Sequence, residues 1–182
     1  MFQNRRRRCT LVAMSRFTDA LLVSPLADGK TWVIERDFGY EREPYGSGNV
    51  IDVPIGFQTD YASVPRILWW IFPPWGRYGN AAVVHDWLYW KQELNGLPIA
   101  HEDADGVFDE AMGVLGVGPV TRWCLFHAVL WFGRFAWIRN QEDRAQGFER
   151  VLPDVQLKAV QRPVRRRAVG QVARALWRTV AG

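Results

Sequence analysis

The chain is organised around the stretch Gly76-Arg77-Tyr78-Gly79-Asn80-Ala81-Ala82-Val83-Val84-His85-Asp86-Trp87-Leu88-Tyr89-Trp90, a glycine-containing turn that runs into an apolar helix. His85 and Asp86 lie near its middle, and Tyr89 follows one turn after His85. Residues four apart share one face of a helix, so the imidazole and the phenol point into the same space. The apolar neighbours predict a buried helix, in which a His and an Asp must be paired, hydrogen-bonded or metal-bound. A core histidine satisfied by its neighbours and a functional site are both open interpretations.

Two further helices are expected downstream of this stretch. Apolar residues recur at helical spacing from Glu102 to Leu115, with Asp105 beside the apolar stripe. The segment from Val120 to about Asn140 is apolar nearly all round, which predicts a core helix with His127 as a core or boundary histidine. It is too short in apolar residues to span a membrane.

The residues before this stretch have the pattern of strands. Short runs rich in Val, Ile, Leu and Trp are separated by turn-forming Gly, Pro, Asp and Asn, and they lie at Ala20–Ser24, Thr31–Arg36 and Val50–Val53. Ser63 and Pro65 predict the start of a short helix, Val64–Ile71, and Asp60 lies where a strand ends and this helix begins. The sequence therefore predicts an α+β domain: a small N-terminal antiparallel sheet packed on about three helices.

Composition and charge set the boundaries of that domain. The 182 residues are 48% hydrophobic, enough for one domain with a real core. The cysteines, Cys9 and Cys124, allow no disulfide framework, which suits a reducing compartment. Residues 1–13 are interpreted as a basic arm or a misplaced start, residues 14–140 as the domain and residues 141–182 as a basic extension. No signal peptide is expected, because no apolar run follows the basic start.

The C-terminal extension is a candidate partner-binding segment. Residues 150–182 carry eight Lys and Arg against the single Asp154. Arg162 to Ala181 has the pattern of a basic amphipathic helix, in which Arg165, Arg166 and Arg167 suit phosphate contacts and Trp177 suits an apolar anchor. We expect non-specific contact with nucleic acid or an anionic membrane, or else a solvated tail.

Three ordered motifs carry a resemblance to a known family. Gly56–Pro65, His85–Tyr89 and Ala104–Phe108 resemble successive motifs of the DUF1353 family, and Met14–Thr18 and Ala128–Gly133 fit its ends. The similarity spans about residues 14–140. The family is uncharacterised and occurs largely in tailed phages and prophages. The resemblance therefore implies a phage context: virion proteins as partners, and the host cytoplasm or the virion as location.

A more distant resemblance bears on chemistry. The spacing His85-Asp86-x-x-Tyr89 is similar to the secreted phospholipase A2 motif, and Asp105 resembles the aspartate behind that family's histidine. The resemblance implies that His85 is the general base, oriented by Asp105 and Tyr89. It further implies that Asp86 helps to hold a cation, for which Asp60 is a second candidate ligand, with calcium or zinc as the metal. None of that family's paired cysteines is present.

Two other interpretations compete with this one. The pair His85-Asp86 is similar to the centre of HD-type phosphohydrolases, which need further histidines, and neither His101 nor His127 is well placed in the sequence for that role. Alternatively, the His/Asp cluster is a structural polar network, and the protein is a non-catalytic virion or accessory component. The leading prediction is a phage or prophage protein with a hydrolase-like His/Asp site, in which Asp60, His85 and Asp105 converge and ester or phosphodiester bonds are the candidate substrates.

Overall fold

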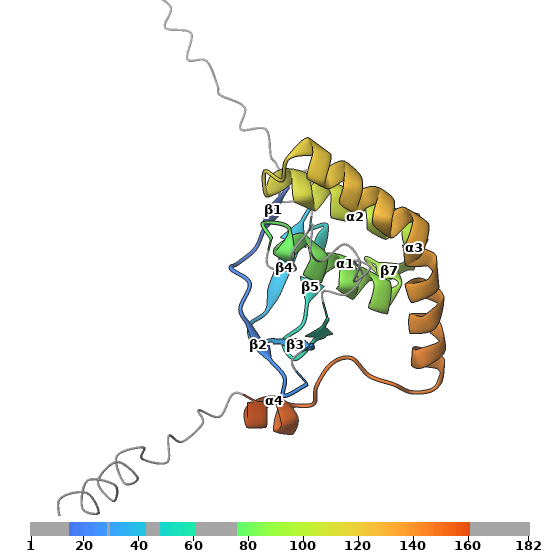
Figure 1. The fold of residues 1–182 in the computed structure, drawn as a ribbon. Coiled ribbons are helices and arrows are strands. Elements are labelled where there is room, and N and C mark those ends of the chain that lie inside the picture. The colour runs from blue at the N-terminus through green and yellow to red at the C-terminus, as the bar shows by residue number, and fades with distance from the viewer. Residues whose placement is uncertain (1–14, 29, 43–47, 61–75, 161–182) are drawn as a thin grey trace, which may run out of the picture.

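The computed structural model describes residues 15–28, 30–42, 48–60 and 76–160. Strands occupy the first part of this chain and helices the second, so the predicted α+β class is confirmed. Figure 1 shows α1 (Gly79–Lys91) near the middle, the strands that precede it toward the left, and α2 (His101–Val114) and α3 (Pro119–Ala145) above it and to its right. The helix predicted over residues 64–71, the arm at residues 1–13 and the whole of the predicted helix from Arg162, with its arginines and Trp177, lie outside the described residues.

The strands form two antiparallel sheets of three strands each and one hairpin. The first sheet has the order β1 (Arg16–Phe17), β4 (Phe38–Glu41) and β5 (Val50–Val53). The second has the order β2 (Val23–Pro25), β3 (Trp32–Ile34) and β6 (Gln58–Thr59). The hairpin joins β7 (Glu93–Leu94) to β8 (Leu97–Pro98).

The sequence predicted one sheet, whereas the structure has two three-stranded sheets and a hairpin. Val50–Val53 is a strand as expected, and Thr31–Arg36 contains β3, but β1, β4 and β6 were not predicted. The strand β4 is buried along its whole length and contains Gly39, so it has no alternation of apolar and polar residues. A side chain at Gly39 would lie 3.0 Å from Ile51 O, which is why a glycine allows the close approach of β5 there.

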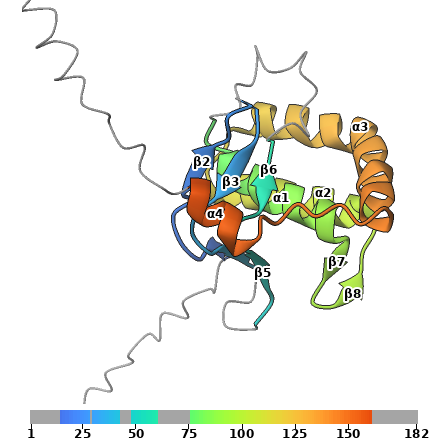
Figure 2. The same ribbon diagram turned by 90° about the horizontal axis from the view of Figure 1, so that it is seen from below.

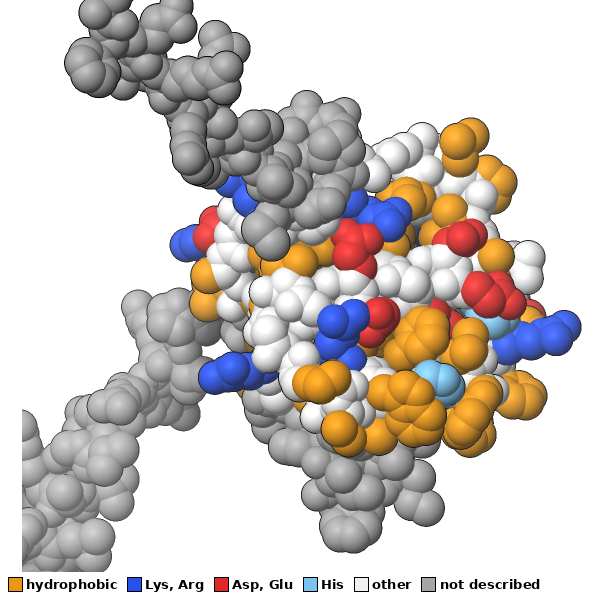
Figure 3. All heavy atoms as spheres, turned by 90° about the horizontal axis from the view of Figure 1, so that it is seen from above, with side chains coloured by type: hydrophobic (Ala, Val, Ile, Leu, Met, Phe, Trp, Pro, Cys, Tyr) orange, Lys and Arg blue, Asp and Glu red, His pale blue; other side chains and the backbone are white. Residues whose placement is uncertain are grey.

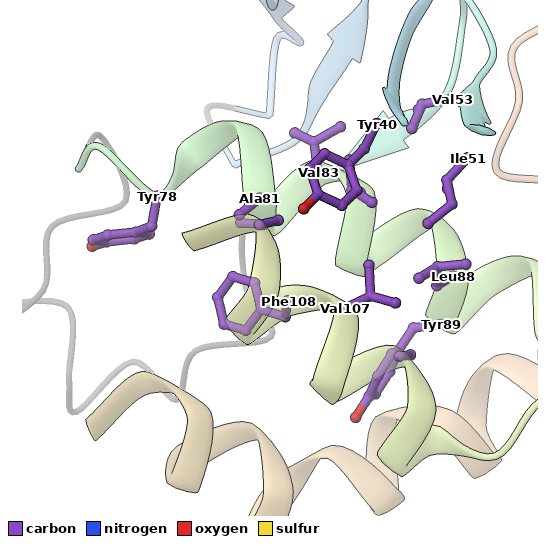
Figure 4. Close-up of a cluster of buried hydrophobic side chains, with 14 of the residues drawn as sticks. Tyr40, Ile51, Val53, Tyr78, Ala81, Val83, Leu88, Tyr89, Val107 and Phe108 are labelled. Carbon is purple, nitrogen blue, oxygen red and sulfur yellow. The ribbon is translucent and has the colours of Figure 1, made fainter. Parts of the chain in front are cut away.

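The central element is α1 (Gly79–Lys91), which is buried on every side. Its sequence is apolar all round because sheet residues pack on one side of it and α2 and α3 on the others. Figure 4 shows side chains from β4 and β5, such as Tyr40 and Ile51, meeting Leu88 of α1 and Val107 of α2 in this core. Gln92 ends the helix with a left-handed backbone (φ 57°).

The helix α3 (Pro119–Ala145) supplies hydrogen bonds that the C-terminal end of α1 lacks. The last carbonyls of a helix have no partner within it. Asn140 Nδ2 donates to Tyr89 O at 3.1 Å, and Arg144 donates to Trp90 O at 3.2 Å and to Lys91 O at 2.9 Å. The end of α3 is thereby held against the end of α1, while its first half packs along α2 (His101–Val114).

The helix α3 differs from the predicted core helix. It buries only one face, with Leu125, Val129, Gly133 and Asn140 among the buried residues. The opposite face exposes large apolar side chains, including Trp123, Trp131, Phe135 and Ile138. The helix is therefore apolar nearly all round, although only one of its faces is buried. None of the described helices is both long enough and apolar enough to cross a bilayer.

The chain beyond α3 returns to the sheets. Arg150 O accepts a hydrogen bond from Gln58 N at 2.7 Å, and Leu152 N donates to Gly56 O at 2.9 Å. The helix α4 (Asp154–Val160) follows beside the second sheet and buries Leu157 (Figures 1 and 2). Residue 140, where the sequence analysis ended the domain, falls within α3, and Val151 beyond α3 packs against the buried core.

Glu110 of α2 joins the helices to the first sheet. Its carboxylate accepts hydrogen bonds from Ser15, Tyr40 and Arg42, with 2.7 Å from Arg42 Nη2 to Oε2. Burial alone would raise the pKa of Glu110, but the hydrogen bonds from Arg42, Tyr40 and Ser15 outweigh it and lower the pKa. A lowered pKa in the folded state stabilises the fold above the unfolded pKa of 4.5 and loses that effect as the pH falls through the folded pKa.

We therefore expect Glu110→Gln to reduce the free energy of unfolding more at pH 7 than at pH 3.5. Urea unfolding of the wild type and the variant at both pH values measures the difference. Glu142→Gln is the matched control, because this exposed glutamate has no side-chain hydrogen bond within the described ranges. A loss for Glu110→Gln that is equal at the two pH values would contradict the electrostatic role.

Candidate functional site

The predicted site residues of α1 and α2 meet in one buried cluster. His85 Nε2 lies 2.8 Å from Asp105 Oδ1, and the Tyr89 hydroxyl donates to the same oxygen at 2.7 Å. His85, Tyr89 and Asp105 are each no more than 1% exposed. The spacing of four residues places the two rings on one face of α1, with centroids 4.1 Å apart, and the packing of α2 on α1 brings Asp105 to them.

Asp105 determines which nitrogen of His85 carries a proton. A carboxylate only accepts hydrogen bonds, so His85 Nε2 donates to it. In the neutral imidazole the lone pair then lies on Nδ1. Nδ1 makes no hydrogen bond to any residue in the described ranges. The contact with Asp105 thus fixes the orientation of the imidazole.

Tyr89 stays protonated in this environment. Burial raises the pKa of its hydroxyl far above the ordinary value, and the hydrogen bond to Asp105 and the charge of Asp105 raise it further. Its role is to donate a hydrogen bond to Asp105, since it cannot act as a base near neutral pH. Figure 4 shows its hydroxyl pointing away from the sheet, toward α3.

His101 lies at this cluster as well, which the sequence did not indicate. Its Nδ1 is 3.7 Å from Asp105 Oδ2, too far for a hydrogen bond, and neither buried atom has a hydrogen-bond partner among the described residues. Its Nε2 lies 3.1 Å from the Glu102 carboxylate at the surface. The i,i+4 spacing of His101 and Asp105 at the start of α2 was the available signal. His127, by contrast, lies on α3, where its Nδ1 contacts Trp123 O at 2.8 Å.

Gly133 of α3 leaves the space that the Tyr89 hydroxyl occupies. A Cβ built on Gly133 would overlap that oxygen and come within 3.0 Å of Tyr89 Cζ. Gly133 is buried against the ring inside a helix, where glycine is otherwise unfavourable. Its position is therefore explained by the close approach of Tyr89, and it belongs to the structure of the site.

Asp86 and Asp60 line one cavity together with His85. Asp86 is buried, and its Oδ2 accepts a hydrogen bond of 2.5 Å from Thr59 Oγ1 at the end of β6. Asp60 follows Thr59 directly and lines the same cavity as His85 and Asp86. Asp60 thus shares the cavity with His85, while Asp105 lies behind the imidazole and is absent from the cavity lining.

A cavity of about 440 Å³ has His85 among its lining residues. Its walls combine polar side chains from α1 and the strand end with apolar and basic ones from α3 and the returning chain, including Phe132, Phe135, Arg139 and Arg150. The guanidinium of Arg150 lies 5.3 Å from the centroid of the Trp90 ring. Arg139 has no hydrogen bond or ion pair within the described part of the chain. The sequence analysis missed both arginines, because nothing in their local pattern connects them to α1.

The described residues of the cavity do not provide a set of ligands for the calcium or zinc suggested in the sequence analysis. Among the described residues, no three His, Cys, Asp or Glu side chains converge as ligands. Thr59 occupies one oxygen of Asp86, and the positive charges of Arg139 and Arg150 in the same walls oppose a cation. The two arginines suit a negatively charged ligand.

Comparison with known families adds one finding. The family model described as "Protein of unknown function (DUF1353)" matches residues 32–129. This range contains Asp60, His85, Asp86, Tyr89 and Asp105, while Gly133, Arg139 and Arg150 lie beyond it. No curated protein and no solved structure matches the chain.

Proposed function

The chain belongs to the DUF1353 family, and from the side chains around its cavity we propose that it is a hydrolase of ester or phosphodiester bonds with His85 as the general base. The observation that carries the proposal is the 2.8 Å contact between His85 Nε2 and Asp105 Oδ1. It holds the imidazole in the tautomer that a base needs. Asp105 and Tyr89 act through His85 as positioning residues and do not touch the substrate.

The proposed reaction uses a water molecule in the cavity as the nucleophile. His85 Nδ1 takes a proton from this water as its oxygen attacks the carbonyl carbon or the phosphorus. The imidazolium that forms is stabilised by the Asp105 carboxylate at Nε2. The bond to the leaving oxygen then breaks, and His85 returns the proton to that oxygen, which restores the neutral imidazole.

The arginines indicate the charge of the substrate. Arg139 of α3 and Arg150 of the returning chain line the same cavity as His85 and Asp86 of α1. In the proposal they bind an anionic group and stabilise the negative charge that develops during attack. Asp60 and Asp86 would repel an anion from their side of the cavity, so the substrate is oriented with its charge toward the arginines.

The biological setting is part of the same proposal. The motifs at residues 56–65, 85–89 and 104–108 resemble those of family members from phages and prophages. We assign the protein to that setting, acting in the host cytoplasm or in the virion with other phage proteins as partners.

A non-catalytic function is the second candidate, and the burial of the cluster favours it. Side chains as enclosed as His85, Tyr89 and Asp105 also occur in purely structural polar networks. In that case the cluster fixes α1 against α2, and the protein acts through its surface as a virion or accessory component.

The variant His85→Gln separates the two functions. The Nε2 of glutamine can take the position of His85 Nε2 and keep the hydrogen bond to Asp105, while no base remains at Nδ1. We expect turnover to fall by about 10²–10⁴-fold, with little change in thermal unfolding. The assay uses p-nitrophenyl butyrate and bis-p-nitrophenyl phosphate, and His127→Gln is the control.

The contrary result is equally specific. If the wild type hydrolyses neither an ester nor a phosphodiester, and His85→Leu, which cannot donate to Asp105, lowers the free energy of unfolding by ~1–3 kcal/mol, the cluster is structural. The hydrolase proposal would then be abandoned.

A further inference from the structure

The outer face of α3 carries a continuous apolar surface that no described residue covers. The aromatic stripe, as we name it, consists of Trp123, His127, Trp131, Phe135 and Ile138. Their spacing of three or four residues places them on one face of the helix, opposite the face that packs on α1 and α2. Trp123, Trp131 and Phe135 are 60%, 65% and 77% exposed. Figure 3 shows the hydrophobic side chains gathered on this side of the molecule.

The stripe is one surface rather than a set of isolated side chains. The ring of His127 lies 4.3 Å from the Trp123 ring and 5.8 Å from the Trp131 ring, measured between centroids. The hydrogen-bonding contact of its Nδ1 with Trp123 O holds it between them. Single exposed apolar residues are ordinary, whereas a contiguous aromatic patch marks a docking surface.

The charges beside the stripe decide what it docks on. Between Pro119 and Gln141 the helix carries Arg122, Arg134 and Arg139 and no Asp or Glu. Arg122 is paired with Asp109 of α2, but Arg134 and Arg139 have no ion pair within the described chain. The surface therefore presents tryptophan and phenylalanine next to unneutralised arginine. This is the composition of helices that lie in the interface of a membrane, with aromatic rings at the headgroup level and cations near anionic lipids.

The same charges argue against two other partners for the stripe, a second copy of this chain and a nucleic acid. A second copy of the stripe would bring Arg134 and Arg139 near the corresponding arginines without a carboxylate to neutralise them. A duplex nucleic acid would offer phosphates to the arginines, but it keeps the faces of its bases stacked inside the helix, away from the stripe. An anionic lipid surface satisfies both the apolar and the cationic parts.

We propose that α3 docks through the aromatic stripe on the surface of an anionic phospholipid membrane, lying in the plane of the interface. Phe135 belongs both to the stripe and to the wall of the cavity that contains His85, with Phe132 beside it. Docking in this orientation brings the mouth of the cavity close to the lipid headgroups. The docking itself does not depend on the proposed hydrolysis.

The test is co-sedimentation of the full-length protein with vesicles of phosphatidylcholine alone or mixed with phosphatidylglycerol. We expect binding to the mixed vesicles, reduced roughly tenfold or more in Trp123→Ser/Trp131→Ser. Arg134→Glu, which leaves the apolar surface intact, is expected to weaken binding roughly fivefold or more and to reduce the preference for anionic lipid. Leu97→Ser is the matched control, because Leu97 of β8 is equally exposed but lies outside the stripe.

Three results would overturn the proposal. The first is an absence of binding to either kind of vesicle. The second is undiminished binding by both α3 variants, which would assign the affinity to the basic C-terminal residues. The third is a dimer, seen by analytical ultracentrifugation without lipid, that Trp123→Ser/Trp131→Ser converts to a monomer. That outcome would make the stripe an interface between copies of the chain.

Discussion

Asp105→Ala is expected to destabilise the protein by about 3–5 kcal/mol. The substitution leaves two buried donors, His85 Nε2–H and the Tyr89 hydroxyl, without the carboxylate oxygen that both now use. Each unsatisfied buried donor costs about 1–3 kcal/mol, and Asp105 itself has no exposed surface through which water could replace it. Urea unfolding at neutral pH measures the loss, and any hydrolysis is lost with it because the imidazole is no longer oriented.

Asp109→Ala is the matched control for this loss. Asp109 lies one turn further along the same helix and pairs with Arg122 at 2.6 Å, but about a third of each side chain is exposed. Exposed pairs of this kind contribute about 0–1 kcal/mol. Asp105→Asn is expected to fall between the two, since its amide oxygen still accepts a hydrogen bond. If Asp105→Ala costs no more than Asp109→Ala, the cluster does not hold α1 on α2.

Gly133→Ala is expected to destabilise the protein by about 2–3 kcal/mol, although alanine is the better helix former. The added methyl group overlaps the Tyr89 hydroxyl, and the buried interface of α1 with α3 leaves the ring no room to move without breaking its contact with Asp105. Gly106→Ala is the control, because Gly106 lies within α2 with open space around its Cα. There the same change should stabilise the fold by about 0.5–1 kcal/mol.

A double-mutant cycle shows whether the Gly133→Ala loss comes from Tyr89. Tyr89→Phe removes the overlapping oxygen and leaves only the tighter approach to Cζ. The double variant Tyr89→Phe/Gly133→Ala is therefore expected to lose about 1 kcal/mol less than the sum of the single variants. Additive losses would mean that the methyl group is accommodated elsewhere. Thermal and urea unfolding of the four proteins provide the comparison.

Much of the functional architecture depends on α3. Its inner face accepts the Tyr89 ring at Gly133 and caps the end of α1 through Asn140 and Arg144. Its residues from Val129 to Asn140 form a wall of the cavity, and its outer face carries the aromatic stripe. One helix thus positions the site, encloses it and presents the surface through which we propose that the protein reaches its membrane.

Local patterns in the sequence determined the helices and half of the site. The apolar runs and their spacing predicted α1 and α2 to within a few residues, because helical periodicity is a property of neighbouring positions. The same local geometry placed His85 and Tyr89 on one face. The pairing of His85 with Asp105 was predicted from the resemblance to the phospholipase A2 motif, and the contact between α1 and α2 supplies its geometry.

The tertiary structure alone decided the rest. The division into two sheets follows from pairings between distant segments, and the fully buried β4 has no periodic pattern to reveal it. His101, Arg139 and Arg150 come to the site because α2, α3 and the returning chain converge on α1. Whether the apolar residues of α3 are buried or exposed depends on how many of its faces pack against other elements. Composition cannot determine that number, since burial is set by packing between segments far apart in the chain.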